Sequence, residues 1–329
     1  MIIKDINFYI FEPRFKQMIQ TPKVTMTHRK ILIIGLVDNT GKEWFGESNV
    51  FDSDWYYEET IDSVKRDILN WFTQTKGQPL HSFDQLVESL NLLNEAPAAR
   101  ATVMMALYPN FHTLSYFQIA PIQTINGDFN DRIVQLDHVA RLKLKWSSHI
   151  LEQVQIIRLM YPDMPISIDA NQTLSASDVP TLKQLTKAQI SYIEEPFHTN
   201  ELLKKADVLP PIAIDEQATS IQAISQLRKS YPISVVVIKP FRLGGIDRTL
   251  ELIHQLQKEG VKIVIGGMYE AALSRYYTAW LSQQGDYAGD VTPHGYYFDV
   301  DLCATSGQLR DGQLYFQPPT VDRRCLKPF

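Results

Sequence analysis

The sequence of 329 residues has little cysteine, no long apolar run and no strong excess of charge. Its two cysteines, Cys303 and Cys325, lack the spacing of a metal site, so free thiols are favoured over a disulfide. The net charge of -5, with acids and bases mixed along the chain, indicates neither nucleic acid nor an anionic membrane as a partner. No run could span a bilayer, and the N-terminus shows no signal-peptide pattern. The expectation is a soluble, cytoplasmic protein.

Several signatures of catalytic sites are also missing. Residues 243–245 (Leu-Gly-Gly) stand outside any G-x-G-x-x-G or P-loop pattern, which favours a plain loop. Residues 149–152 do not form an H-E-x-x-H motif, and no G-x-S-x-G elbow occurs. His198 and His294 have no partner that the sequence identifies, so surface positions are expected.

The chain is long enough to bury a large core, with 44% hydrophobic residues, and its two ends differ in pattern. Strands are expected at 2–11, 29–37 and 43–47, the last two as a hairpin, and helices at 57–72, 83–93 and 98–107. The polar stretch 16–27 is expected to be a mobile loop. These elements predict an N-terminal α+β domain at 1–118, a catalytic domain at 119–299, and a tail at 300–329 that packs back on the first domain.

Within the second domain, short apolar runs end in a charged residue or a glycine at steps of 21 to 27 residues. The closing residues are Lys145, Asp169, Glu194, Asp215, Lys239 and Gly266. Strands that alternate with helices at this spacing are typical of βαβ units on a buried parallel sheet. Five or more consecutive units favour a (β/α) TIM-type barrel, in which strand ends meet on one rim.

The residue types at this rim predict proton chemistry next to a divalent cation. Lys143 and Lys145 alternate on one strand and so share a face, where burial and like charge would lower a lysine pKa toward that of a usable base. Asp169, Glu194 and Asp215 offer hard oxygen ligands, which suit Mg²⁺ better than zinc. A cation on three carboxylates can hold a substrate carboxylate and stabilise the charge formed when the adjacent carbon loses a proton.

Each of these signals has a simpler explanation when taken alone. A single Lys-x-Lys pair is usually a solvated edge, and an aspartate that closes a strand is often a helix N-cap. Asn171 and Glu195 would serve equally well as cap and surface residues. The case for a site rests on co-occurrence, because capping alone rarely produces five charged strand ends in the right order.

The motif order resembles that of a known family. Lys-x-Lys at 143–145, Asp-x-Asn at 169–171, Glu-Glu-Pro at 194–196, Asp-Glu at 215–216, Ile-Lys-Pro at 238–240 and Gly-Gly-Met-x-Glu at 266–270 resemble the enolase superfamily, in its muconate-lactonizing subgroup. Within that subgroup the chain is similar to the o-succinylbenzoate synthase family of menaquinone biosynthesis. Residues 44–48 and 57–60 resemble the family's capping domain. The resemblance implies an enolase-like modified barrel with an N-terminal α+β capping domain.

The resemblance also implies roles for individual residues. Lys145 matches the base that takes the proton, Lys143 its neighbour on the substrate carboxylate, and Lys239 a cation on the opposite face. The matched Mg²⁺ ligands are Asp169, Glu194 and Asp215, and Mn²⁺ is expected as a substitute. The remaining matches are Asn171 and Glu216 around the ligands, with Asn171 also expected to contact substrate, and Gly266, Gly267 and Met268 as the wall of a succinyl pocket. Residues 16–27 match a lid.

The activity implied is a Mg²⁺-dependent dehydration of 2-succinyl-6-hydroxy-2,4-cyclohexadiene-1-carboxylate, so the expected partner is a small carboxylate substrate. Two alternatives stay open: an N-succinylamino acid racemase with the same residues, and a non-catalytic barrel that binds small anions. The last would be expected to lack at least one ligand or lysine, and none is missing. The oligomeric state is open, a homo-oligomer included.

The chain departs from the family pattern before the first lysine strand. Between residues 125 and 142 there is room for only an abbreviated helix, at about 131–140. A reduced first barrel unit is therefore expected, and whether the barrel is complete there stays open.

Overall fold

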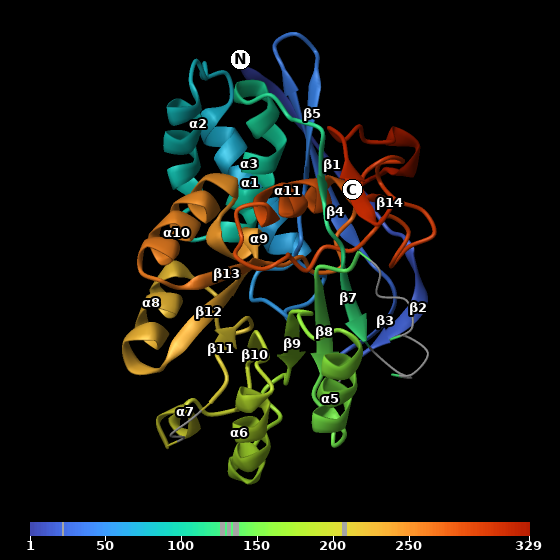
Figure 1. The fold of residues 1–329 in the computed structure, drawn as a ribbon. Coiled ribbons are helices and arrows are strands. Elements are labelled where there is room, and N and C mark those ends of the chain that lie inside the picture. The colour runs from blue at the N-terminus through green and yellow to red at the C-terminus, as the bar shows by residue number, and fades with distance from the viewer. Residues whose placement is uncertain (22, 126–128, 130–132, 134–137, 206–208) are drawn as a thin grey trace.

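The computed structural model describes residues 1–21, 23–125, 129, 133, 138–205 and 209–329. Figure 1 shows an N-terminal antiparallel sheet with helices beside it, and a parallel sheet whose strands follow one another in chain order. Most side chains of the parallel strands are buried, as expected when both faces of a sheet are covered. The fold is a modified TIM-type barrel with an N-terminal capping domain, which confirms the predicted fold class.

The capping domain is built on a four-stranded sheet with the order β16-β1-β4-β5. Strand β1 spans Ile3–Phe11, β4 spans Ile31–Asp38, β5 spans Glu43–Glu47, and β16 spans Lys327–Pro328. Strands β4 and β5 pair antiparallel across a tight turn, which confirms the predicted hairpin. Because β16 pairs with β1, the end of the chain lies against the N-terminal sheet.

The helices beside this sheet occur where the apolar spacing predicted them, with shifted ends. Helix α1 spans Ile61–Thr75, α2 spans Phe83–Ser89 followed by a 3-10 turn η1 at Leu90–Leu93, and α3 spans Pro97–Phe111. Helix α1 begins four residues later than predicted because the hydroxyl of Thr60 accepts from the backbone N–H of Ser63 and caps the helix there.

Residues 16–27, which we predicted to be an irregular loop, belong to a two-stranded ribbon. Strand β2 spans Arg14–Gln20 and pairs antiparallel with β3, which spans Thr25–His28; residue 22 lies outside the described residues. The prediction was wrong because the ribbon is mostly exposed and carries no apolar alternation. Backbone pairing holds it instead, and the N–H of Lys16 donates to the carbonyl of Tyr297 at 2.8 Å.

The parallel sheet has the strand order β7 to β13, so each strand pairs with its neighbours in the sequence of strands. Its strands are β7 Ile122–Ile125, β8 Arg141–Lys145, β9 Ile166–Asp169, β10 Tyr192–Glu194, β11 Ile212–Ile214, β12 Ile233–Ile238 and β13 Lys262–Ile265. Strand β7 pairs with β8 over four residues, so the first barrel strand is in place. The short helix predicted at 131–140 falls largely outside the described residues.

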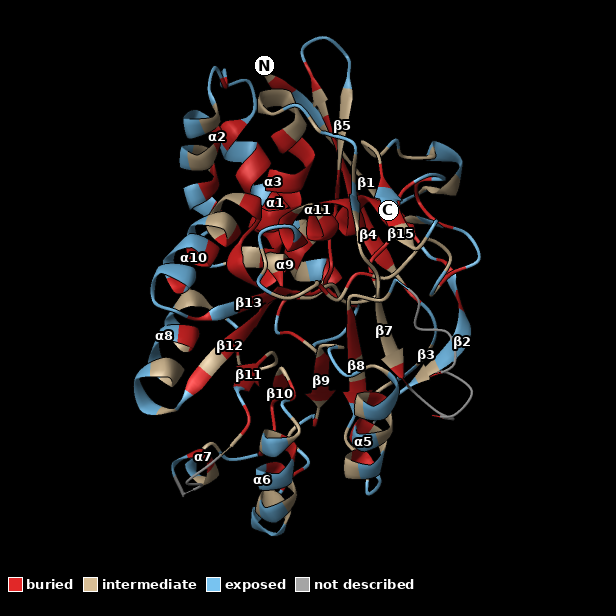
Figure 2. Cartoon of the chain, viewed as in Figure 1, coloured by how far each residue is buried: buried red, intermediate tan, exposed pale blue. Residues whose placement is uncertain are grey.

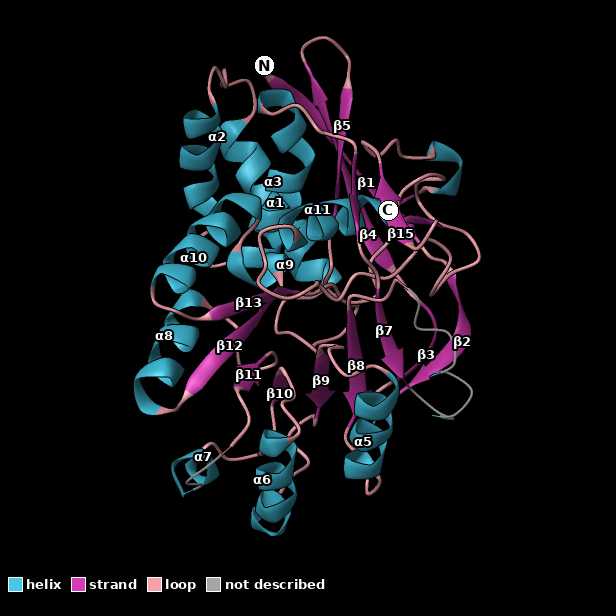
Figure 3. Ribbon diagram, in the orientation of Figure 1, coloured by secondary structure: helices cyan, strands magenta, loops and turns pink. Residues whose placement is uncertain are grey.

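Helices follow the strands and cover the outer face of the sheet (Figure 3). They are α5 Ile150–Met160, η2 Ala176–Asp178, α6 Val179–Lys187, α7 Glu201–Lys205, α8 Ile221–Ser230, α9 Pro240–Leu243, α10 Ile246–Lys258 and α11 Ala272–Ser282. Figure 2 shows that α6, α7 and α8 expose much of their surface, whereas α11 is buried where the barrel meets the capping domain. No helix in the described ranges is long and apolar enough to cross a membrane.

The segment after α11 occupies the eighth position of the barrel. Asp290 pairs with Gly266 in a parallel bridge, and its N–H donates to the carbonyl of Ile265 at 2.8 Å. The chain then forms a three-stranded sheet of β6 (Phe117–Ile119), β15 (Gln313–Phe316) and β14 (Gln308–Arg310), followed by the 3-10 turn η3 at Arg323–Cys325. The eighth position therefore brings an acidic residue next to the glycine pair that ends β13.

Candidate active site

The predicted site residues lie together at the carboxyl ends of neighbouring strands. Lys145 and Asp169 are register partners on β8 and β9, and Asp169 is the partner of Glu194 on β10. Asp215 follows β11 by one residue, and Lys239 follows β12 by one residue. Parallel pairing of short strands is sufficient for this convergence, because parallel strands that start in register also end at one rim.

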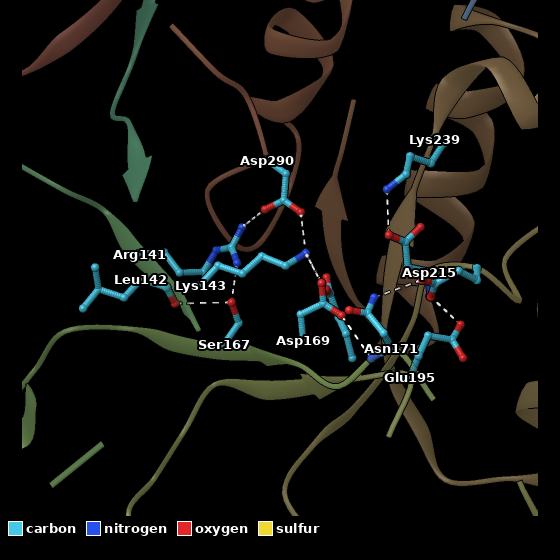
Figure 4. Close-up of polar contacts among 12 residues, drawn as sticks. Arg141, Leu142, Lys143, Ser167, Asp169, Asn171, Glu195, Asp215, Lys239 and Asp290 are labelled. Carbon is cyan, nitrogen blue, oxygen red and sulfur yellow. Dashed lines mark hydrogen bonds and ion pairs between the residues drawn. The ribbon is translucent and has the colours of Figure 1, made fainter. Parts of the chain in front are cut away.

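Lys143 lies in the middle of the carboxylates (Figure 4). Its ammonium forms an ion pair with Glu194, lies 3.9 Å from Asp169 Oδ2, and donates to Asp290 Oδ2 at 3.1 Å. Burial lowers the pKa of Lys143, but the negative charges of Asp290, Glu194 and Asp169 outweigh burial and raise it well above the usual value. The lowered lysine pKa that we predicted for this pair is therefore wrong for Lys143, which stays an ammonium.

Lys145 differs from Lys143 in its surroundings. It is exposed at the rim, and no carboxylate among the described residues forms an ion pair with it. The two lysines lie two residues apart on one strand, and Lys143 is the one turned toward the carboxylates. The strand thus presents an ion-paired Lys143 inside the site and an exposed Lys145 at its rim.

Lys239 and Arg242 both contact Asp215 on the far side of the site. The Lys239 ammonium donates to Asp215 Oδ2 at 2.7 Å, and the buried Arg242 guanidinium donates to the Asp215 carbonyl at 2.9 Å. Burial raises the pKa of Asp215, but the positive charges of Lys239, Arg242 and Lys143 outweigh burial and lower it. Asp215 is therefore an ionised carboxylate held by two cations. The pKa of Lys239 is raised, since the charge of Asp215 outweighs burial.

Glu194 is the most buried carboxylate of the set, with 1% of its surface exposed. Burial raises its pKa to about 8, although Lys143 acts in the opposite direction. One oxygen, Oε1, is buried and has no hydrogen-bond partner in the part of the chain that the structure describes. A buried oxygen without a donor is costly, and a hard cation is one way to satisfy it.

The three predicted metal ligands fit a divalent cation in chemistry but are not gathered around one point. No three acidic, histidine or cysteine side chains in the described residues form a cluster that could hold a metal ion as they stand. The ammonium groups of Lys143 and Lys239 lie against Glu194 and Asp215 instead. The donor set is three hard carboxylates, one with an unsatisfied oxygen, which suits Mg²⁺.

The residues expected around the ligands, Asn171 and Glu216, contact each other at the rim, and Asn171 has a positive φ. Asn171 has a φ of 45°, and its amide donates to Glu216 Oε1 at 3.3 Å while its N–H donates to Asp169 Oδ1 at 3.3 Å. Burial and the charge of Asp215 raise the pKa of Glu216. Asn171 therefore contacts both Asp169 and Glu216, and a positive φ outside glycine is costly unless the surrounding structure fixes it.

Glu195 is buried. Of the two simpler roles suggested for it, helix cap and surface residue, the structure therefore excludes the surface position. Its φ is 40°, and its carboxylate accepts from the N–H groups of Asp215 at 2.8 Å and Gln217 at 2.9 Å. Burial raises its pKa to about 7 against these hydrogen bonds. The side chain therefore fixes the turn that carries Asp215.

The glycine pair after β13, Gly266 and Gly267, lets neighbouring side chains approach the backbone closely, as expected for residues without a side chain. A Cβ on Gly266 would lie 3.2 Å from Lys239 Nζ, and one on Gly267 would lie 2.0 Å from Glu270 Oε2. Met268 is partly buried in the same turn. Of the two histidines expected at the surface, His198 is exposed, whereas His294 is 28% exposed and lies 3.5 Å from Asp301 Oδ2.

Sequence reasoning missed Arg141, Arg242, Asp290 and the aromatic cover of the site. Arg141 continues the alternation of the lysine pair and could have been found from it, but Asp290 belongs to no motif. The guanidinium carbon of Arg242 lies 4.6 Å from the ring centre of Tyr56 in the capping domain.

The capping domain also reaches the barrel through the ribbon of β2 and β3. Phe15 of β2 packs edge-to-face on Tyr269, with ring centres 5.4 Å apart, and lies 5.1 Å from Phe298. Tyr269 in turn packs edge-to-face on Tyr297 at 5.0 Å. Aromatic side chains from both domains thus meet next to the turn that carries Gly266 and Gly267.

Comparison with known proteins agrees with this arrangement. Residues 129–320 match the family model described as "Enolase C-terminal domain-like". An o-succinylbenzoate synthase from Haemophilus influenzae is 34% identical over 72% of this chain and 74% of that protein. An N-succinylamino acid racemase from Thermus thermophilus is 26% identical over 95% of this chain and 91% of that protein.

A solved structure of an enolase-superfamily member from Listeria innocua supports the fold. It has a TM-score of 0.83 and 20% identity, and covers 98% of this chain and 96% of that one. The family model covers more than half of the chain, and the Haemophilus relative shares more than 30% of its residues over two thirds of it. The chain therefore belongs to the enolase superfamily, in its o-succinylbenzoate synthase family.

Proposed function

We propose that the protein is a Mg²⁺-dependent lyase that converts 2-succinyl-6-hydroxy-2,4-cyclohexadiene-1-carboxylate to o-succinylbenzoate in menaquinone biosynthesis. The observation that carries the proposal is the row of Lys145, Asp169 and Glu194 in direct register on adjacent strands. The Haemophilus relative named o-succinylbenzoate synthase supports this choice of reaction.

Asp169, Glu194 and Asp215 are the residues that would hold the cation, and Mn²⁺ would suit the same oxygens. When bound, Mg²⁺ supplies positive charge for the substrate carboxylate and for the second negative charge that forms when the adjacent carbon loses its proton. The unsatisfied Oε1 of Glu194 is the structural feature that favours a cation at this position.

The three lysines have different roles in the proposed reaction. Lys145 takes the proton next to the carboxylate, since it matches the base of the family and lies in register with Asp169 at the strand end. The same side chain then returns the proton to the hydroxyl group, which leaves as water, and the ring becomes aromatic. Lys143 stays an ammonium among its carboxylates and binds the substrate carboxylate, while Lys239 supplies a positive charge on the opposite face.

The aromatic residues between the two domains would enclose the substrate. Phe15, Tyr269 and Tyr297 lie next to the glycine turn at the end of β13, and Asn171 lies at the rim. Exclusion of water strengthens each electrostatic interaction in the site. We propose that Gly266, Gly267 and Met268 form the wall on which the succinyl arm lies and that the ribbon of β2 and β3 is the lid.

N-succinylamino acid racemisation is the second candidate, and the Thermus relative named for it supports it. In that reaction Lys145 and Lys239 would both act as bases, one on each face of the substrate. The residues required are the same, so only an assay can separate the two.

The test is to assay the purified protein with Mg²⁺ on the dehydration substrate and on an N-succinylamino acid. Dehydration should exceed racemisation, and EDTA should abolish the activity until Mg²⁺ or Mn²⁺ is restored. Racemisation without dehydration would replace the first proposal by the second. Absence of both activities with Mg²⁺ bound would remove both.

A further inference from the structure

Asp290 is a carboxylate at the rim of the site that belongs to none of the sequence motifs. Its backbone is fixed by β13, since its N–H donates to the Ile265 carbonyl at 2.8 Å and its carbonyl accepts from Gly267 at 3.4 Å. The residue before it must be small, because a Cβ on Gly289 would lie 2.7 Å from the Ile265 carbonyl oxygen. The position of Asp290 is thus set by the barrel itself.

The carboxylate of Asp290 is shared between two cations (Figure 4). One oxygen, Oδ1, is paired with the Arg141 guanidinium, and the other, Oδ2, accepts from Lys143 at 3.1 Å. Arg141 is buried and fixed in turn, since it donates to Ser167 Oγ at 2.5 Å and to the Ala288 carbonyl at 2.8 Å. Because these contacts hold Arg141, Arg141 in turn fixes the position of the Asp290 carboxylate.

Among the described residues, Lys143 has three carboxylate partners, and two of them are the proposed cation ligands Glu194 and Asp169. The ammonium and a divalent cation would compete for the same oxygens, since two positive charges cannot share them without repulsion. Asp290 is the partner outside the ligand set. Without it, Lys143 would have no anion to contact once the other two carboxylates bind the cation.

We propose that Asp290 is a positioning residue that retains the Lys143 ammonium when Glu194 and Asp169 bind the divalent cation. This leaves those oxygens for the divalent cation and keeps the ammonium beside the cation, where the substrate carboxylate lies. The inference rests on the proposed function, because it assumes that these carboxylates bind a divalent cation. Asp290 itself touches neither cation nor substrate in this scheme.

The experiment is a double-mutant cycle on Mg²⁺ affinity, measured by calorimetry without substrate. Asp290→Asn should weaken Mg²⁺ binding by about tenfold, because Lys143 then pairs with the ligands alone. In a Lys143→Ala background the same change should have little effect. Asp286→Asn is the matched control, since Asp286 lies in the same segment but pairs with Lys262, and its Mg²⁺ affinity should equal that of the wild type.

A second measurement separates positioning from loss of negative charge. In Asp290→Asn, kcat/KM on the preferred substrate should fall about tenfold or more at saturating Mg²⁺, and this loss should also vanish in the Lys143→Ala background. If Asn at this position prevents folding because Arg141 loses its ion pair, Asp290→Glu takes its place in both cycles. It keeps the charge but displaces the oxygen that Lys143 contacts.

The outcomes distinguish this inference from the proposed function. Equal losses with and without Lys143 would overturn the positioning role, because Asp290 would then act through its charge or through the fold. A wild-type protein that binds no Mg²⁺ and acts on neither substrate would overturn the proposed function, and the positioning role with it. If the wild-type protein is active but the effects of the Asp290 and Lys143 substitutions simply add, the positioning role is overturned and the proposed function stands.

Discussion

The ammonium of Lys239 donates a 2.7 Å hydrogen bond to Asp215 Oδ2 and so joins the ends of β12 and β11. The Arg242 guanidinium donates to the Asp215 carbonyl at 2.9 Å and to Asp215 Oδ1 at 3.4 Å. Asp215 would therefore keep its orientation through Arg242 when Lys239 turns to a substrate. Because Arg242 would hold Asp215 while Lys239 contacts the substrate, Asp215 and Lys239 are the most informative positions for substitution.

Asp215→Asn should remove most Mg²⁺ binding and nearly all turnover. The substitution keeps the shape of the side chain but removes the charge that a divalent cation requires. Calorimetric titration with Mg²⁺ measures the loss, and the melting temperature serves as the control for folding. Wild-type Mg²⁺ affinity in this variant would exclude Asp215 from the ligands.

Lys145→Ala should fold normally and lose turnover. The side chain is exposed, so its removal leaves no buried cavity. Turnover should fall by about a thousandfold, the scale expected for losing a general base. Steady-state kinetics on the dehydration substrate provide the check, and a rate near that of the wild type would place the base elsewhere.

Lys239→Arg compared with Lys239→Ala separates dehydration from racemisation. Arginine keeps the positive charge but cannot act as a base at neutral pH. The Arg variant should therefore keep a measurable fraction of dehydration and lose racemisation, while the Ala variant should lose far more of the dehydration. Product formation and exchange of the α-proton in deuterated water are the measurements.

Two results would contradict this assignment of Lys239. Equal loss of dehydration in both variants would mean that its charge is not required or that arginine does not fit beside Gly266, where space is tight. Exchange from both enantiomers in the Arg variant would refute an arrangement with one lysine on each face.

Glu47 should make the stability of the protein depend on pH. Burial raises its pKa from 4.5 to about 8, against hydrogen bonds from the N–H groups of Ser274 and Ala271. Below pH 4.5 the carboxyl is protonated in both states, and its contribution is fully present. Between 4.5 and 8 only the unfolded chain releases the proton, so the free energy of unfolding falls as pH rises.

The measurement is urea unfolding at pH 5 and at pH 8 for the wild type and Glu47→Gln. The wild type should lose more stability across this range than the variant, by about 1 to 4 kcal/mol, since the amide does not titrate. Asp62→Asn, at the start of α1, is a control with the same change of charge. Parallel pH dependence in wild type and Glu47→Gln would show that Glu47 is charged in the folded state throughout.

The barrel strands were predictable because their signal is local. From β9 to β13 each strand is a short, largely apolar run that ends at or just before a charged residue or a glycine, and parallel pairing brings those closing residues to one edge regardless of what lies between them. The hairpin of β4 and β5 was predictable for a similar reason, since the turn and both strands are adjacent in sequence. The ribbon of β2 and β3 was missed because a backbone hydrogen bond ties it to Tyr297, far along the chain. The side chains of the ribbon do not indicate this pairing.

The sequence by itself determined which residue types stand at the strand ends and therefore the order of Lys143, Lys145, Asp169, Glu194 and Asp215 around the rim. Only the tertiary structure decided their charge states and partners. Lys143 was expected to have a lowered pKa from its neighbour lysine, yet its pKa is raised, because the barrel places Asp290 from a distant segment against it. Alternation along one strand fixes the face on which a side chain lies, but electrostatic energy depends on distances between strands, which only the folded structure sets.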